Sequence, residues 1–361
     1  MTIHGHVLRM AAAKGPKFQR IPAPAVPSFR IELDWDQNPN MSFSDDGKYL
    51  GISVGRATAG SGINVAFLKH MGGDEFSLLE TFQVNQGALY LGLSFISSTE
   101  YLWGGEVSLS GPRRIRFDAN DNRVSAGQPQ SGGISRSYAV ARRQDGVTIA
   151  SSAVSPHLAT FDVPIGETSN FQPLSTVSWP ASSYPLNHAV WAPGDGRGYV
   201  SSKTFVRLVT VESGDVTVHG SAYGIANQCV NPAVCPISGH VAVCALGDNI
   251  NRALIYKWDG SNHTLLTTLT SELPGISRCL DYSHDGRYLV VVGDGQSQNN
   301  YKDRLLVFER DGDNYELIDS PDYIPAGFNW RREIRAKFSP TGHLCVFAQG
   351  NSPEVILYAR R

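Results

Sequence analysis

The sequence predicts an all-β protein in which seven four-stranded antiparallel units close into a ring, and three observations lead to this prediction. First, a pattern of an aromatic residue, a serine, a polar turn centred on glycine and an apolar run recurs along the 361 residues. Second, helical periodicity is absent almost everywhere, and no long segment carries helix-capping residues at both ends. Third, the last unit stops half-way, and its missing half stands near the beginning of the chain.

Three segments carry the repeated pattern without gaps. They are FSDDGKYLGISVG from Phe43, YSHDGRYLVVVGD from Tyr282 and FSPTGHLCVFAQG from Phe338. A glycine between two apolar stretches marks a β-hairpin, because the tight turn needs a residue that tolerates a positive φ. Glycine occupies this place in all three segments, for example at Gly47. Each segment is therefore expected to form two short strands joined by a tight turn.

Four weaker copies lie between these segments. FISSTEYLWGG from Phe95 has Thr99 in the glycine position, and ARRQDGVTIASS from Ala141 has lost the aromatic residue. WAPGDGRGYVSS from Trp191 carries one extra residue, and CPISGHVAVCA from Cys235 has cysteine in place of phenylalanine. The seven units recur at intervals of roughly 50 residues, which is a period typical of propeller blades.

Each unit also has a second half. VAFLKHMGGDEFSLLETF, LIYKWDGSNHTLLTTL and LLVFERDGDNYELIDS share one order: a strand, a polar glycine turn and a further strand. Two hairpins make a four-stranded sheet, which cannot bury both of its faces alone. Repetition around an axis lets each sheet pack on its neighbours, so the sequence predicts a seven-bladed β-propeller, within the usual range of roughly four to eight blades.

The two ends of the chain are expected to meet in the last blade. The terminal segment SPEVILYARR matches only the first half of RLLVFERDGDNYELIDSPDYIP, which begins at Arg304. The second half reappears near the other end of the chain, where GPKFQRI from Gly15 aligns with GDNYELI from Gly312. We therefore expect the N-terminal strand to complete the last blade, because ring closure removes the open sheet edges of an unclosed array.

The predicted organisation is one domain preceded by a short arm. Residues 1–14, which include His4 and His6, form a flexible N-terminal arm. Residues 15–361 form a single propeller, in which residues 15–29 supply the closing strand. The seven blades are expected to begin near residues 30, 87, 133, 184, 227, 276 and 328.

The repeated text resembles WD40-like propellers in the broad sense. Trp258–Asp259 is a WD pair, but it precedes a turn and has no Gly-His partner at the right distance upstream. The text is more similar to the repeat propellers encoded in tailed-phage and prophage genomes. The segments of this chain that match the repeat unit of those propellers are FSDDGKYLGISV, LIYKWDGSNHTLL, LLVFERDGDNYELI and IPAGF. The resemblance is strong over blades one, five, six and seven, and it is faint from Gly87 to Tyr223.

This resemblance implies a non-enzymatic structural protein of a tailed-phage virion, placed in the tail, collar or fibre apparatus. Its expected partners are other virion proteins and a host-surface glycan or receptor. Many copies in a symmetric particle would make weak single contacts effective through multivalency. The expected location is the virion after synthesis in the host cytoplasm, because Arg9 and Lys14 interrupt the N-terminus and leave no apolar run of signal-peptide length.

Composition disfavours two other classes of protein. The net charge is −2, whereas a general nucleic-acid binder carries a basic excess, so no nucleic-acid partner is expected. No stretch approaches the roughly 18 apolar residues of a membrane span, so no membrane insertion is expected. Two alternatives stay open: a cellular scaffold propeller, and a lactonase-like or glycan-processing enzyme. The enzyme would place polar and titratable groups together at the mouth of the central channel.

No catalytic, cofactor-binding or metal-binding residue is predicted. Cys229, Cys235 and Cys244 form a C-x5-C-x8-C pattern, for which buried core positions are favoured over a zinc site. The odd total of five cysteines argues for buried thiols rather than a disulfide framework. The loop DANDNR, Asp118 to Arg123, offers oxygen ligands but lacks the glycine and the terminal glutamate of an EF-hand loop. We expect it to form a hairpin turn, with a calcium site as the alternative.

Loops and arginines supply the candidate contact surfaces. GSG at Gly60–Gly62 and GDGQSQNN at Gly293–Asn300 are predicted inter-strand loops, which on a rigid scaffold act either in binding or as solvated connections. Three groups of arginines are expected to be ordinary surface charge, with pairing to acidic groups of a partner as the alternative. These groups are Arg113, Arg114 and Arg116; Arg142 and Arg143; and Arg331, Arg332 and Arg335.

Overall fold

The structure is a computed structural model that describes the strands and most of the hairpin turns of the chain. Most connections from the second to the third strand of a blade, and from one blade to the next, lie outside the described residues. The described residues are 17–24, 40–53, 65–82, 92–104, 113–127, 137–143, 146–152, 158–163, 165–166, 173–178, 188–194, 196–201, 205–219, 225, 229–245, 252–269, 276–294, 304–321, 334–348 and 354–361.

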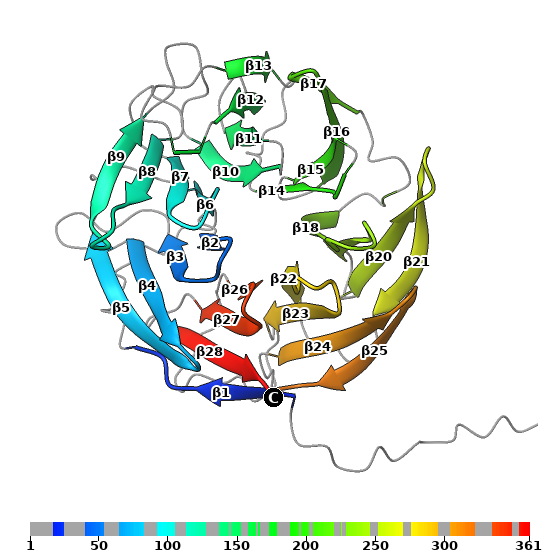
Figure 1. Ribbon diagram of the computed structural model, residues 1–361. Coiled ribbons are helices and arrows are strands. Elements are labelled where there is room, and N and C mark those ends of the chain that lie inside the picture. Colours follow the sequence, from blue (N-terminus) through cyan, green and yellow to red (C-terminus); the bar gives the residue numbers. More distant parts are fainter. Residues whose placement is uncertain are drawn as a thin grey trace, which may run out of the picture.

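Within these residues every regular element is a β-strand, and the strands form seven four-stranded antiparallel sheets. Figure 1 shows the sheets arranged as blades around a central axis, which confirms the predicted seven-bladed propeller. The strands are, blade by blade, β2 (Asn40–Phe43), β3 (Tyr49–Ser53), β4 (Val65–Gly72) and β5 (Glu75–Phe82); β6 (Gly92–Phe95), β7 (Glu100–Gly104), β8 (Arg113–Phe117) and β9 (Arg123–Gly127); β10 (Ser137–Arg142), β11 (Val147–Ser152), β12 (Leu158–Asp162) and β13 (Pro173–Val177); β14 (His188–Trp191), β15 (Arg197–Ser201), β16 (Val206–Glu212) and β17 (Asp215–Val218); β18 (Cys229–Val234), β19 (Val241–Ala245), β20 (Arg252–Trp258) and β21 (His263–Leu269); β22 (Ile276–Tyr282), β23 (Tyr288–Asp294), β24 (Arg304–Asp311) and β25 (Asn314–Asp319); and β26 (Ile334–Phe338), β27 (His343–Ala348), β28 (Glu354–Arg360) and β1 (Phe18–Ile21).

In the first six blades the chain runs from the axis outwards, so that the first strand is innermost and the fourth lies at the rim (Figure 1). The turn between the first and second strands and the turn between the third and fourth strands lie at the same end of the blade, because neighbouring strands are antiparallel. We call this end of the propeller the hairpin face, and we call the two turns of a blade its inner and outer hairpins.

The seventh blade is completed by the beginning of the chain, as the sequence predicts. Its strand order is β26, β27, β28 and β1, and β1 pairs antiparallel with β28 from Phe18 opposite Arg360 to Ile21 opposite Leu357. The backbone N–H of Arg361 donates to the carbonyl of Lys17 at 2.8 Å, where a covalent outer hairpin would otherwise turn. Phe18 is 2% exposed and packs in the core between the sixth and seventh blades.

The recurrent Ser-x-Asp-Gly text is explained by the inner hairpin. In the first blade the hydroxyl of Ser44 donates to Asp46 at 2.7 Å and accepts the backbone N–H of Tyr49 at 2.9 Å. Gly47 has a φ of 72°, which a residue with a side chain adopts only with strain. Ser283 makes the same two contacts in the sixth blade, at 2.6 and 2.8 Å. The motif therefore fixes the turn and needs no catalytic explanation.

The hydrophobic core lies between adjacent blades. The cluster between the fifth and sixth blades, for example, contains Cys244 and Ile255 on one side and Leu289 and Leu306 on the other, all at most 1% exposed. Each sheet thus buries its faces against its neighbours, which is the physical reason that the repeat must close into a ring.

Candidate binding site in the central channel

A cavity of about 410 Å³ lies on the axis of the propeller. The innermost strands of all seven blades contribute to its lining, namely β2, β6, β10, β14, β18, β22 and β26. Because alternate residues of a strand share a face, the positions one and three residues before the repeated aromatic face the same way. Residues at these two positions line the cavity, and they include Asn40, Ser42, Ser94, His188, Cys279, Asp281, Arg335 and Lys337.

The one described acid on an inner strand of this lining is engaged in an ion pair. Asp281 on β22 accepts a hydrogen bond from Lys337 Nζ at 2.7 Å and another from the backbone N–H of Phe338 at 2.8 Å. Both donors belong to β26 of the next blade, so the pair also joins the sixth and seventh blades. Burial is the largest single effect and would lower the pKa of Lys337, but the charge of Asp281, its hydrogen bond and the nearby Cys279 together outweigh burial, and the pKa is raised. Lys337 is therefore a cation at neutral pH.

His188 lies on β14, across the channel from β26 (Figure 1). Burial lowers the pKa of His188 well below its ordinary value, and the positive charges of Arg335 and Lys337 lower it further. The positive charges of Arg335 and Lys337 therefore act on His188 across the channel, although the fourth and seventh blades are not neighbours. His188 is a neutral imidazole at pH 7, and its Nε2 is buried with no hydrogen-bond partner among the described residues.

A second hollow opens beside the channel, at the inner hairpins of the third, fourth and fifth blades. This cleft has a volume of about 690 Å³ and shares Arg142 and Trp191 with the channel lining. The guanidinium of Arg143 lies over the Trp191 ring, 4.9 Å from its centroid. The indole Nε1 of Trp191 donates to the carbonyl of Ala141 at 3.1 Å, which fixes the ring against the third blade. The lining of the cleft therefore includes two arginines and an aromatic ring that a hydrogen bond fixes in place.

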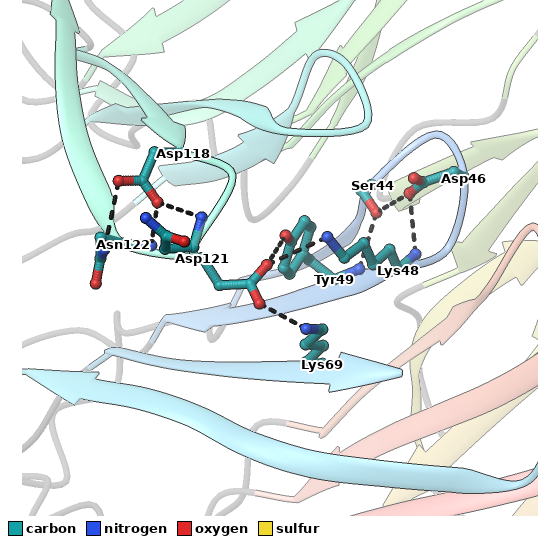
Figure 2. A network of polar contacts seen from close by, with 9 residues as sticks. Ser44, Asp46, Lys48, Tyr49, Lys69, Asp118, Asp121 and Asn122 are labelled. Atoms are coloured by element: carbon teal, nitrogen blue, oxygen red, sulfur yellow. Dashed lines mark hydrogen bonds and ion pairs between the residues drawn. The ribbon is translucent and has the colours of Figure 1, made fainter. Parts of the chain in front are cut away.

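Polar contacts between blades converge on the residue that directly follows the inner-hairpin glycine, which we call the junction position. In the first blade this residue is Lys48, and Figure 2 shows it beside Asp121 from the outer hairpin of the second blade. Asp121 also accepts hydrogen bonds from Lys69, at 2.5 Å, and from the hydroxyl of Tyr49. The contact with Lys69, followed by those of Tyr49 and Lys48, holds the pKa of Asp121 below its ordinary value.

The same geometry recurs in four further pairs of blades. In each of them the side chain at the junction position contacts the outer hairpin of the next blade, or the strand end beside it. The pairs are Glu100 Oε1 with the N–H of Gly166 at 2.9 Å, Arg197 over the Trp258 ring at 4.7 Å, His240 with Asp313 at 3.2 Å and His343 with Asp74 at 3.7 Å.

The cysteines and the DANDNR loop take structural positions. Cys229 belongs to one interblade core, whereas Cys235 and Cys244 belong to the next, and all three thiols are free and buried. Burial raises the pKa of the Cys229 thiol to about 12. Among the described residues, no three His, Cys, Asp or Glu side chains gather as a metal site would require. DANDNR forms the outer hairpin of the second blade, where Asp118 accepts the N–H groups of Asn120 and Asn122, both at 2.8 Å (Figure 2).

Two of the arginines expected on the surface lie inside the protein, so that expectation is wrong for them. Arg114 is 0% exposed because it lies on the same face of its sheet as its cross-strand partner Leu102, and this face packs on the third blade. Arg335 is 3% exposed because it points into the lining of the channel. Arg116 is half-buried, as are Arg142 and Arg143 in the cleft.

Other predicted contact residues fall outside the part of the chain that the structure describes. They are the 1–14 arm with His4 and His6, the GSG loop at Gly60–Gly62, residues 295–300 of the GDGQSQNN loop, Arg331 and Arg332, and the side chain of Arg113.

The channel residues were not singled out from the sequence, although a signal for them exists. The residue directly before the repeated aromatic is a serine in the first two blades, Asp281 in the sixth and Lys337 in the seventh. A polar residue in an otherwise apolar strand, at one fixed position of a repeat, marks a lining that several blades share. The junction position carries a similar signal, because it directly follows the hairpin glycine.

No family model matches the chain, and no curated protein sequence matches it at a significant level. Solved structures do resemble it. A chain in the crystal structure of the mitotic checkpoint complex is 12% identical and has a TM-score of 0.64, with 100% of this chain and 99% of that chain covered. A protein from Lactobacillus plantarum is 16% identical and has a TM-score of 0.54, with 71% of this chain and 77% of that chain covered.

At these identities the likeness shows the fold alone. None of the described segments forms a helix long and apolar enough to cross a lipid bilayer. The chain is thus a seven-bladed β-propeller.

Proposed function

We propose that this propeller is a rigid, non-enzymatic interaction module of a tailed-phage virion, held in the tail, collar or fibre apparatus. Support for the phage particle comes from the repeated text of the first, fifth, sixth and seventh blades, which resembles phage-encoded propellers. Support for an interaction role comes from the closed ring, because loops and turns on a rigid scaffold present a surface of fixed shape. The many copies of a symmetric particle would add avidity to weak single contacts.

The observation that carries the proposal is the apolar and aromatic surface of the hairpin face beside the cleft. Ile237, in the inner hairpin of the fifth blade, is 66% exposed, and its neighbour Pro236 lines both the cleft and the channel. Trp191 and Arg143 lie in the same cleft. Aromatic side chains and arginine are the residues that most often anchor protein interfaces. We therefore assign the docking surface for a neighbouring virion subunit to this part of the hairpin face.

The first test is mass spectrometry of density-purified particles, followed by cryo-EM of the same particles. We expect the chain at stoichiometric abundance beside capsid and tail proteins, with its hairpin face against a neighbouring subunit. If the chain is absent from particles and stays free in the lysate, the virion proposal is wrong. A pull-down with the soluble chain would then test the alternative of a cellular scaffold.

A pair of matched variants tests the docking surface. Ile237→Asp should lower the amount of the chain that enters particles, because it places a charge in the middle of an apolar contact. Leu265→Asp makes the same change at a 49% exposed position on β21, at the rim of the same blade, and should leave incorporation unchanged. Equal incorporation of both variants would move the docking surface elsewhere.

One observation favours the enzyme alternative, because titratable groups do converge in the channel. Against it, Asp281 is held by Lys337 and a backbone N–H, whereas glycoside hydrolysis needs two carboxylates that can act on one bond. Purified protein assayed on a panel of lactones and glycosides decides between the two functions. Turnover that Asp281→Asn abolishes and the exposed control Asp285→Asn retains would establish the enzyme, and no turnover would leave the binding role.

A further inference from the structure

The lining of the central channel carries an excess of positive charge. The docking surface proposed on the hairpin face does not account for this charge. Arg142 from the third blade and Arg335 and Lys337 from the seventh line one cavity of about 410 Å³. The described carboxylates of the same lining are Asp281, which Lys337 and Phe338 N–H engage, and Asp45, which is exposed in the inner hairpin of the first blade. Positive charge therefore exceeds negative charge inside the channel.

The guanidinium of Arg335 is also held away from water, whereas the side chain of Lys337 is 42% exposed and Arg142 is half-buried. Arg335 is 3% exposed, and a buried guanidinium is stabilised when an anion shares its low-dielectric surroundings. Two donors from other blades lie in the same lining. The Nε of Arg142 and the Nε2 of His188 are buried and have no hydrogen-bond partner among the described residues. Because His188 is neutral, its Nε2 carries a hydrogen in one of the two tautomers and can donate to an anion without adding charge.

The shape of the cavity suits a small molecule. Its volume lies within the range of roughly 300–1,000 Å³ that ligand pockets occupy. The cleft shares Arg142 and Trp191 with the channel, and Arg143 lies beside them. A ligand that enters through the cleft therefore meets Arg143 first and Arg142 next, at the boundary between the cleft and the channel. It then reaches the cationic side chains inside the channel.

We propose that the channel binds a small anion that carries two or more carboxylate or phosphate groups. One group lies between Arg335 and His188 on opposite sides of the channel, and another lies against Arg142 at the boundary with the cleft. Separate blades supply these donors, so a bound anion also links the third, fourth and seventh blades across the axis. This inference is independent of the virion proposal, because it concerns the channel in the isolated protein.

The test uses the purified full chain with citrate and, separately, inorganic pyrophosphate, which carries two phosphate groups, at an ionic strength held constant with sodium chloride. We expect at least one of the two anions to give a saturable heat of binding and to raise the melting temperature. Citrate binding alone would identify a carboxylate ligand, and pyrophosphate binding alone would identify a phosphate ligand. An effect that chloride reproduces, or no effect of either anion, would overturn the proposal.

Matched variants locate the site. Arg142→Gln and His188→Gln should each weaken binding by about tenfold or more, because each removes a donor to a charged group. Arg142→Lys, which keeps the charge, should retain part of the affinity. Arg20→Gln makes the same change in charge on β1 at the rim and should bind as the parent does. Unchanged affinity in Arg142→Gln and His188→Gln, in protein whose circular dichroism matches the parent, would place the anion elsewhere and overturn the assignment.

Discussion

The strongly repeated blades and the divergent blades use different chemistry at the same place. Between the first and second blades, and again between the fifth and sixth, an aspartate of one outer hairpin meets Lys48 or His240 at the junction position of the blade before it. Between the fourth and fifth blades, the same position holds Arg197, whose guanidinium lies over an indole ring. Between the third and fourth blades, the contact beside the open cleft is made outside the junction position, where the guanidinium of Arg143 in the inner hairpin lies over the Trp191 ring.

This difference shows that hairpin geometry, and not a particular residue pair, sets the contact between blades. Because two antiparallel hairpins end at the same face in every blade, the junction position lies beside the next outer hairpin in the five pairs of blades described above. The contact at this position can be an ion pair, a hydrogen bond from a backbone N–H or a contact with an aromatic ring. The repeated sequence can therefore diverge in the middle of the chain while the ring is preserved, and the cleft lies among the three blades that carry the two arginine–tryptophan contacts.

The largest effect is expected at the noncovalent hairpin of the seventh blade. Phe18→Ala should lower the free energy of unfolding by about 3–5 kcal/mol, because it removes a buried aromatic ring and leaves a cavity. Equilibrium urea unfolding measures this change. The neighbouring Gln19 is exposed, so Gln19→Ala should stay within about 0.5 kcal/mol of the parent. Equal costs for the two variants would mean that β1 contributes little to closure.

The next largest effect concerns the ionic junctions. Asp121→Ala leaves Lys48, Lys69 and the Tyr49 hydroxyl without their shared acceptor, and we expect a loss of about 1–2 kcal/mol in the free energy of unfolding. Asp313→Ala removes the aspartate of the fifth and sixth blades, whose side chain is 47% exposed, so its cost should be smaller. Urea midpoints of the two variants test the order, and a reversed order would show that burial does not set the strength of these junctions.

Acid should act selectively on the junctions that contain histidine. Burial lowers the pKa of His240 and of His343 from the ordinary 6.5, so the unfolded chain takes up these protons more readily than the folded protein does. Their contribution to stability is therefore complete above pH 6.5 and is lost as the pH falls towards the lowered values. The urea midpoint should decrease across this window, and the H240Q/H343Q double variant should show a shallower decrease. An equally steep decrease in the double variant would assign the effect to other groups, such as His188.

The smallest effect is expected at the arginine–tryptophan contact beside the cleft. Arg143→Gln removes the cation over Trp191 and should lower the free energy of unfolding by less than about 1 kcal/mol. The fluorescence of the tryptophans, followed during urea unfolding, reports both the local change and the midpoint. A loss of unfolding free energy as large as that of Asp121→Ala would show that the arginine–tryptophan contact and the ionic contacts of Asp121 are equally strong.

The repeat was sufficient to predict the fold, because most hairpins are specified locally by a glycine with positive φ and by the apolar residues of the flanking strands. The pairing of β1 with β28 was predictable for the same reason, since the two halves of one repeat unit could be recognised at opposite ends of the chain. The buried position of Arg335 was not predictable, because a charged residue on a short strand gives no local sign of whether it faces water or the axis. Its burial follows from the alternation of the strand and from the closure of the ring together.

The channel was also beyond what one sequence shows directly. His188 and Arg335 lie far apart along the chain, and only the closed ring brings their blades to opposite sides of one cavity. The position that they share in the repeat becomes informative once the hairpins are aligned and the inward-facing positions are known.

Closure by β1 also determines the order in which the molecule can assemble. The hydrogen bond from Arg361 Nε to Gln19 Oε1 joins residues 342 positions apart, and contacts of such separation form slowly because a long loop must close first. Until they form, the edge of β28 is open to any matching strand. The β1 strand of a second copy is such a strand, so refolding at high protein concentration should yield exchanged dimers, and dilution should favour the closed monomer.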